Sequence, residues 1–269
     1  MISVASTGHW ISEYICDSIA LGIPNSHRKL VDFCSREESL ISYGHLRGSF
    51  EALIEAKEFW HIDHGYMLSM KRDFKINSLT GKKETILPSV HSNEFNKSYF
   101  RISYNSFFNS GLGNFPEDRF LKLNIKINPK RSSGSKILLI PPELERAEKF
   151  YNLKESWVED TIKEIKKFSD REIIISRKHD ANKASSYFKE SFVVVTFHSN
   201  AGIDAMIQGV PCIFLNKERS FSDISQIENP PYNEKILYNL AYWQWNINEM
   251  KSGEAWDFLL TQRKHDKKK

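Results

Sequence analysis

Cysteine is rare in this sequence, and its placement argues against two kinds of site. Only three of the 269 residues are cysteine, and Cys16, Cys34 and Cys212 lie too far apart to form a CxxC pair. Neither a cysteine-ligated zinc site nor a disulfide framework is indicated. The odd count, together with an N-terminus that lacks a basic and apolar leader, leads us to expect a protein of the reducing cytoplasm.

Long apolar runs and several catalytic motifs are also missing. No run is long enough to span a bilayer, so we expect no membrane insertion. The patterns GxxxxGK[ST], GxSxG and HExxH do not occur, which argues against ATPases, serine hydrolases and zinc proteases. Asp-x-Asp is absent too, so the sequence offers no paired acids to bridge a divalent metal and a diphosphate.

The residues that are present suit an ordinary folded protein. Hydrophobic residues make up 40% of the chain and charged residues 27%, so disorder is not expected. The length fits one large α/β domain or two domains of roughly 130 residues each. Aromatic residues reach 13%, and we expect most of them in the core, with sugar or base stacking as the alternative use.

The net charge of +4 is unevenly distributed. Residues 263–269 carry five basic side chains and one acidic side chain. Such a tail can contact nucleic acid or an anionic membrane, and a solvated, frayed terminus is the alternative.

Strand and helix patterns alternate in the first half of the chain. Expected strands are residues 1–6, 40–43 and 59–62, and expected helices are residues 10–21 and 49–58. A strand–helix–strand order is typical of a parallel sheet.

A polar, turn-forming segment at residues 128–135 is interpreted as an interdomain linker. It predicts one domain at residues 1–133 and a second domain, with C-terminal helices, at residues 134–269. In the second domain, strands are expected at residues 136–140, 172–176, 192–197 and 212–215. Helices are expected at residues 156–168 and 201–208 and in the closing segment.

The most informative block is FVVVTFHSNAGIDAMIQGVPCIFL, residues 192–215. A buried strand leads into a turn of small residues and then a helix, whose first N–H groups lack partners within the helix. Small residues at Ser199, Ala201 and Gly202 should let a phosphate approach, and the helix dipole favours the anion by about 0.3–1 kcal/mol. Asp204, one turn into the helix, is placed to contact ribose hydroxyls. Packing alone is the alternative explanation of this turn.

This block resembles the donor-binding signature of the two-Rossmann-domain (GT-B) glycosyltransferases. In that family an acid–Ala pair and a Gly-x-Pro turn help to hold the nucleotide diphosphate; here they are Asp204–Ala205 and Gly209–Val210–Pro211. Many members have Glu where this chain has Asp204, which shortens the reach of the carboxylate. The closing segment, residues 240–256, resembles small glycosyltransferase-like proteins of bacteriophages.

The resemblance implies an α/β fold with two Rossmann-like domains, whose parallel sheets face each other across a cleft. It implies that residues 1–133 form the acceptor-side domain and residues 134–269 the donor-binding domain. It also implies a nucleotide-sugar co-substrate, a UDP-sugar in the first instance, and no cofactor. Arg177 and Lys178 follow a strand at the same sheet edge and could neutralise a leaving diphosphate, or be surface charge only. The donor-side candidates are Arg177, Lys178, His198, Ser199, Asn200, Ala201, Gly202 and Asp204.

Candidate catalytic residues lie at strand ends in the first half. Asp63 follows a strand at the carboxyl edge, where open α/β proteins bind ligands, and could act as the base that an inverting transfer requires. A turn-capping role is the alternative. His64 and His9 are the other candidates for the base. The expected acceptor-side residues are Tyr43, Arg47, Tyr66 and Arg101.

The expected activity is inverting glycosyl transfer without a metal, because no Asp-x-Asp pair is present. A hydroxymethylated pyrimidine in phage DNA is the first expected acceptor, which would require the base to leave the stack. A surface polysaccharide or lipid-linked glycan is the alternative acceptor, and a non-catalytic nucleotide-binding module is the alternative class.

Overall fold

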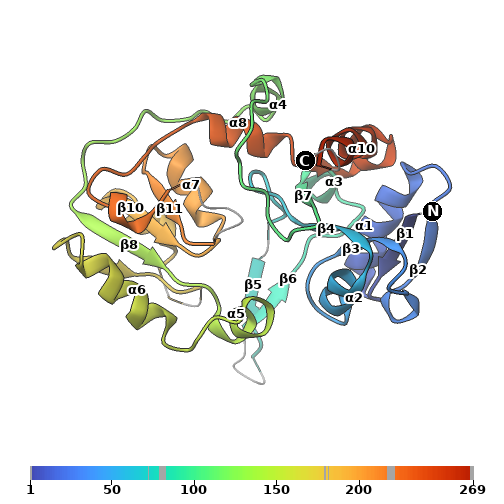
Figure 1. The fold of residues 1–269 in the computed structure, drawn as a ribbon, viewed down its shortest axis with the longest axis horizontal. Coiled ribbons are helices and arrows are strands. Elements are labelled where there is room, and N and C mark those ends of the chain that lie inside the picture. Colours follow the sequence, from blue (N-terminus) through green and yellow to red (C-terminus); the bar gives the residue numbers. More distant parts are fainter. Residues whose placement is uncertain are drawn as a thin grey trace. The chain divides into compact units, whose positions relative to one another are not determined.

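The computed structural model describes residues 2–71, 73–78, 83–178, 180, 182–216 and 222–266. The chain forms two compact units, which are described separately (Figure 1). Unit 1 comprises Met1–Phe107 and Trp243–Lys269, and unit 2 comprises Phe108–Tyr242. Both are mixed α/β structures with largely parallel sheets, which confirms the predicted class.

Unit 1 contains a six-stranded sheet in the order β12-β7-β4-β3-β1-β2. Strands β1 to β4 are parallel, β7 runs antiparallel to β4, and β12 runs antiparallel to β7. The strands are β1 (Ile2–Ser6), β2 (His27–Leu30), β3 (Ser39–Tyr43), β4 (Glu58–His64), β7 (Tyr99–Tyr104) and β12 (Gln244–Asn246). A separate antiparallel pair is formed by β5 (Asp73–Ile76) and β6 (Lys83–Ile86).

Helices cover both faces of this sheet. The main core packs α1 (Trp10–Leu21), α9 (Ile247–Lys251) and α10 (Glu254–Asp266) on the face that carries Trp60 and Ile62. The short helix α3 (Asn93–Lys97) packs on α9, while α2 (Ser49–Glu55) packs on β3 and β4. Because successive side chains of a strand point to opposite faces, His61 and Asp63 lie on the face away from Trp60.

Unit 2 contains a parallel sheet of four strands in the order β11-β10-β8-β9. The strands are β8 (Lys136–Ile140), β9 (Ile173–Ile175), β10 (Ser191–Thr196) and β11 (Cys212–Phe214). The helices are α4 (Asp118–Lys122), α5 (Leu144–Tyr151), α6 (Trp157–Lys166), α7 (Ala201–Ile207) and α8 (Lys235–Ala241). Short 3-10 helices occur at Val31–Phe33 in unit 1, and at Ala184–Tyr187 and Ile224–Gln226 in unit 2.

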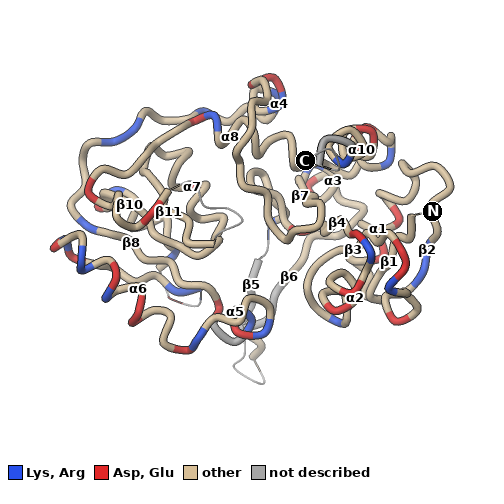
Figure 2. The backbone as a smooth tube through the Cα atoms, in the orientation of Figure 1, with Lys and Arg blue, Asp and Glu red and all other residues tan. Residues whose placement is uncertain are grey.

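The two faces of the second sheet are covered by different helices. Val158 and Ile165 of α6 pack with Ile137 and Val193 in one apolar cluster. Helix α7 packs on β10 and β11. Acidic residues occupy the first turn of α6 and lysines its last turn, so this exposed helix shows both signs of charge along its length (Figure 2). That order complements the helix dipole and gives no basic stripe.

The predicted domain boundary at residue 133 differs from the observed division. The closing segment belongs to unit 1, because β12 pairs with β7 and Trp245, Met250 and Trp256 join the core of that unit. Residues 108–133 belong to unit 2, where the Asn239 amide donates to the carbonyl of Gly111 (2.8 Å). The expectation of C-terminal helices in the second domain is therefore wrong for α9 and α10. These pairings join segments far apart in sequence, which local patterns do not reveal.

Among the described residues, no helix is both long enough and apolar enough to cross a membrane.

Candidate functional site

Both sheets share one strand order. Counted along the chain, the parallel strands of each unit lie in the order second, first, third, fourth. The direction of connection therefore reverses between β1 and β3 in unit 1 and between β8 and β10 in unit 2. Ligands of open α/β proteins bind beside the carboxyl ends of strands at such points. His9 and Tyr43 lie there in unit 1, and Glu143 and His198 follow β8 and β10 in unit 2.

In unit 2, the turn after β10 is held by aromatic packing. The His198 ring stacks on Phe108, with centroids 4.8 Å apart, and its edge meets Tyr151 at 5.3 Å. The Ser199 N–H donates to Thr196 Oγ1 (3.3 Å), which ties the turn to the strand end. The turn is therefore held in a defined conformation, and His198 contributes to it through ring packing.

The first amides of α7 already have acceptors. The Ala201 N–H donates to Ser199 Oγ (3.2 Å), and the Gly202 N–H donates to the Ser199 carbonyl (3.0 Å). The Ile203 N–H donates to the Asn200 carbonyl (2.9 Å). The expectation of unsatisfied N–H groups is wrong for these three, because the turn folds back on the helix. A phosphate would have to displace the Ser199 hydroxyl to reach the first of them.

The two glycines of the block are explained by close packing. A Cβ at Gly202 would lie 2.5 Å from Cys212 Sγ and 2.8 Å from Phe214 Cζ, so this position faces the sheet and not a ligand. At Gly209, whose φ is +82°, a Cβ would lie 2.1 Å from the Pro129 carbonyl oxygen. Gly202 therefore keeps helix and sheet together, and the expectation that it makes room for an anion is wrong.

Asp204 retains the expected position in the first turn of α7, where only part of the residue is open to solvent. Desolvation raises the pKa of its carboxyl to about 6. This group therefore changes charge close to neutral pH, where it could either accept or donate a hydrogen bond to a ribose hydroxyl.

Arg177 and Lys178 are exposed after β9, and β8 separates that strand from β10. Two strand spacings place the strand ends about 10 Å apart. Lys178 Nζ is 2.8 Å from the Glu143 carboxylate, which lies after β8. Lys178 is thus already paired with an acid. Among the described residues Arg177 forms no such ion pair, so it is the donor-side cation better able to bind an anion.

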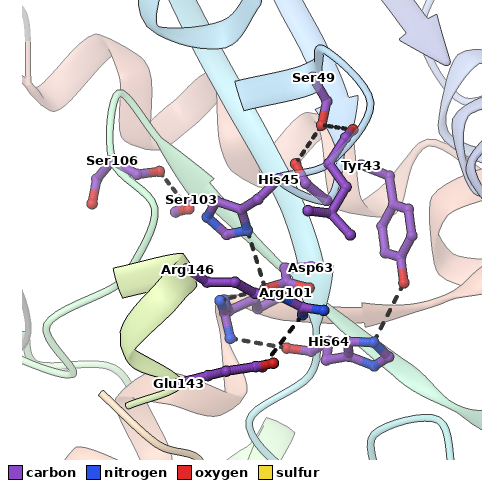
Figure 3. Close-up of polar contacts among 12 residues, drawn as sticks. Tyr43, His45, Ser49, Asp63, His64, Arg101, Ser103, Ser106, Glu143 and Arg146 are labelled. Carbon is purple, nitrogen blue, oxygen red and sulfur yellow. Dashed lines mark hydrogen bonds and ion pairs between the residues drawn. The ribbon is translucent and has the colours of Figure 1, made fainter. Parts of the chain in front are cut away.

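In unit 1, Asp63 forms an ion pair with Arg101. The two residues are direct partners across β4 and β7, and Arg101 Nη2 lies 2.7 Å from Asp63 Oδ2 (Figure 3). Burial alone would raise the pKa of Asp63, but Arg101, followed by the neighbouring histidines, outweighs it and holds this pKa well below its usual range. A carboxylate that resists protonation is a weak base, so the geometry suits Asp63 better to stabilising positive charge.

His64 points to the other face of β4 and lies between two hydroxyls. Its Nε2 is 3.5 Å from Tyr43 Oη (Figure 3). Its Nδ1 is 3.2 Å from Ser69 Oγ. These two contacts orient the imidazole ring.

The remaining candidates of unit 1 divide into edge residues and buried residues. His9 begins α1, and burial, followed by the charge of Arg47, lowers its pKa. Arg47 is exposed in the loop after β3. Tyr66 is 2% exposed and Arg101 5%, and the guanidinium lies 5.5 Å from the Tyr66 ring centroid. Tyr66 and Arg101 therefore support Asp63. They do not form the exposed acceptor surface that the sequence had led us to expect.

Two residues beside Asp63 were missed from the sequence. His45 comes from the loop after β3, and its Nδ1 lies 4.0 Å from Asp63 Oδ2. His61 is two residues before Asp63 on β4 and is completely buried. The available signal was strand alternation, because His61 must share a face with Asp63.

Comparisons with known proteins give little guidance. No protein-family model matches the chain, and no curated protein matches it. Among solved structures, a Thermosulfurimonas dismutans KpsC described as a beta Kdo 2,4 transferase is similar at a TM-score of 0.46. It is 11% identical over 91% of this chain and 91% of that chain. A second T. dismutans KpsC, described as a beta Kdo 2,7 transferase, has a TM-score of 0.46 and 12% identity over 94% of this chain and 98% of that chain.

Proposed function

We propose that this protein is a glycosyltransferase that moves a sugar from a nucleotide-activated donor to a hydroxyl acceptor. The observation that carries the proposal is the β10–α7–β11 segment. It combines the donor-type sequence block with the strand, turn and helix that the block predicts, at the carboxyl edge beside a reversal of connection.

On the donor side, the proposed contacts come from the turn and from exposed charge. Ser199 and Asn200 offer small polar groups at the start of α7, and Asp204 follows one turn later. Arg177 and Lys178 would neutralise the leaving diphosphate, so no divalent ion need bridge it. A UDP-sugar is the first donor to test.

On the acceptor side, Asp63 is proposed as the ionised carboxylate that stabilises the positively charged sugar ring in an inverting transfer. His64, oriented by Tyr43 and Ser69, is then the first candidate for the base, and His9 is the second.

The acceptor is proposed as a hydroxymethylated pyrimidine in DNA or, alternatively, a surface or lipid-linked polysaccharide. The basic tail lends the DNA acceptor less support than its composition suggested. Arg263 pairs with Glu58, inside unit 1, and Lys267–Lys269 lie outside the described residues.

A thermal-shift screen of nucleotide-sugars tests the proposal, because a ligand that binds only the folded state raises the melting temperature. A hit should then be hydrolysed slowly in the absence of an acceptor. Asp204→Asn should weaken the shift, while Asp160→Asn, an exposed acid on α6, serves as the matched control.

Three results would direct the interpretation. If no nucleotide-sugar shifts the melting temperature, the proposal is wrong. Stabilisation without any hydrolysis or transfer would favour the non-catalytic binding module. A salt-dependent gel shift on modified DNA would favour the DNA acceptor over the polysaccharide.

A further inference from the structure

Two histidines of unit 1, His45 and His61, have no part in the proposed transfer and lie beside Asp63. A metal ion held by these residues would replace the charge-stabilising role proposed above for Asp63. The rings of His45 and His61 are 4.4 Å apart between centroids. One ligand atom from each of the three residues can be chosen so that all lie within 4.8 Å of one another. Two imidazoles and one carboxylate therefore lie close together.

The three side chains come from two neighbouring strands and the loop that follows one of them. His61 and Asp63 share a face because they alternate along β4, and His45 follows the adjacent strand β3. Phe107 packs on both histidine rings, with centroids at 5.0 Å from His45 and 4.9 Å from His61. The cluster thus has polar atoms on one side and an apolar wall on the other.

His61 makes the cluster unusual for an ordinary core. Its side chain is 0% exposed, and neither ring nitrogen makes a hydrogen bond of good geometry within the described part of the chain, although the Phe107 backbone lies near the ring. A buried polar group left in this way costs about 1–3 kcal/mol and therefore calls for an explanation. A metal ion would satisfy one of these nitrogens.

We propose that His45, His61 and Asp63 bind a zinc-class transition-metal ion and leave a fourth position open. Two histidines and a carboxylate with an open position form a common donor set for such ions. Metal–nitrogen distances of about 2.0–2.1 Å require ligand atoms roughly 3.3 Å apart. The ligand atoms of the three residues are farther apart than this by on the order of 1 Å. Rotation of the His45 side chain, which lies on a loop, can close that difference.

Arg101 is compatible with this site. A carboxylate has two oxygens and about four lone-pair positions, so Asp63 can hold the guanidinium and a metal together. Bound in this way, Arg101 fixes the orientation of the Asp63 carboxylate. Its positive charge weakens metal binding and favours an anion at the open position.

The test is a titration of chelator-treated full-length protein with Co²⁺ and then Zn²⁺. We expect one equivalent of Co²⁺ to give visible ligand-field absorption that Zn²⁺ abolishes, and Zn²⁺ to raise the melting temperature. His45→Ala, which lies on a loop, should weaken Co²⁺ binding by more than the about 10–100-fold typical of losing an outer partner. Asp63→Asn should weaken it as well, and His27→Ala, an exposed histidine outside the cluster, should not.

Absence of a Co²⁺ spectrum in the wild type would overturn the proposal. Equal binding by His45→Ala and His27→Ala, with unchanged circular dichroism, would also overturn it. Because no nucleotide-sugar is present in this titration, either result is independent of whether the protein is a glycosyltransferase.

Discussion

The two units share a strand order, but the charged groups at their sheet edges behave differently. In unit 2 the sheet ends with parallel strands, and Arg177, Lys178 and Asp204 are exposed around its carboxyl edge. In unit 1 the sheet continues into the antiparallel strands β7 and β12, and Arg101 is placed directly opposite Asp63. An antiparallel extension brings the beginning of a strand to the edge where parallel strands end, and so supplies a buried partner charge there.

The largest effect should come from removing the buried cation of unit 1. Arg101→Met leaves Asp63 without its partner and should destabilise the protein by about 3–5 kcal/mol. Arg177→Met, the matched exposed cation of unit 2, should change stability by no more than about 0.5 kcal/mol. Urea denaturation of both variants measures the loss in the free energy of unfolding. Equal losses would contradict the view that the cation is buried at one sheet edge and exposed at the other.

The same pair gives a pH dependence. The pKa of Asp63 is depressed in the folded protein, so its stabilising contribution is present above the ordinary carboxyl pKa and is lost as the pH falls. The stability difference between wild type and Arg101→Met should therefore narrow in acid. A difference that stays constant down to strongly acidic pH would contradict the ion-pair explanation.

Overpacking of the donor-side block should have the next largest effect. Gly202→Val pushes atoms into Cys212 and Phe214 and should cost about 1–3 kcal/mol or more. Ala201→Val, one residue earlier and only half-buried, is the control and should cost less. Melting curves distinguish the two, and an unaffected Gly202→Val would mean that this position faces open space.

The end of α10 offers a comparison within unit 1. Arg263 Nε donates to Glu58 Oε2 (3.0 Å), and Glu58 also accepts from Ser39 and Tyr104. Arg263→Ala should destabilise by about 1–3 kcal/mol, because it leaves a buried carboxylate with fewer partners. Deleting Lys267–Lys269 alone should leave the melting temperature unchanged, and a large loss on that deletion would contradict this assignment.

The smallest effect concerns Asp204 and depends on the proposed function. If its carboxylate accepts from the donor, affinity should fall as the pH drops through about 6, by at most about tenfold for each pH unit. Calorimetric titration at several pH values measures this. Asp204→Asn should remove the pH dependence, and persistence of the same dependence in that variant would assign it to another group.

Local patterns predicted much of the fold, but not the partners of the charged residues. The apolar run at residues 192–197 became β10 (Ser191–Thr196), and the strand at residues 136–140 matches β8. The pairing of β12 with β7 joins distant segments, so neither the division of the chain nor the burial of Arg101 could be read locally. His45 was missed because a loop residue gives no periodic signal, and the arrangement of two sheets facing across a cleft stays a prediction.

The return of the chain to unit 1 has a consequence for biosynthesis. Unit 2 is continuous in sequence, whereas β12, Trp245 and Trp256 reach unit 1 only with the final segment. On the ribosome, unit 2 can therefore complete its sheet while the earlier half of unit 1 still exposes part of its core. That interval is when the nascent chain is most vulnerable to aggregation, and a chaperone acting on this protein should recognise the exposed apolar face of the first sheet.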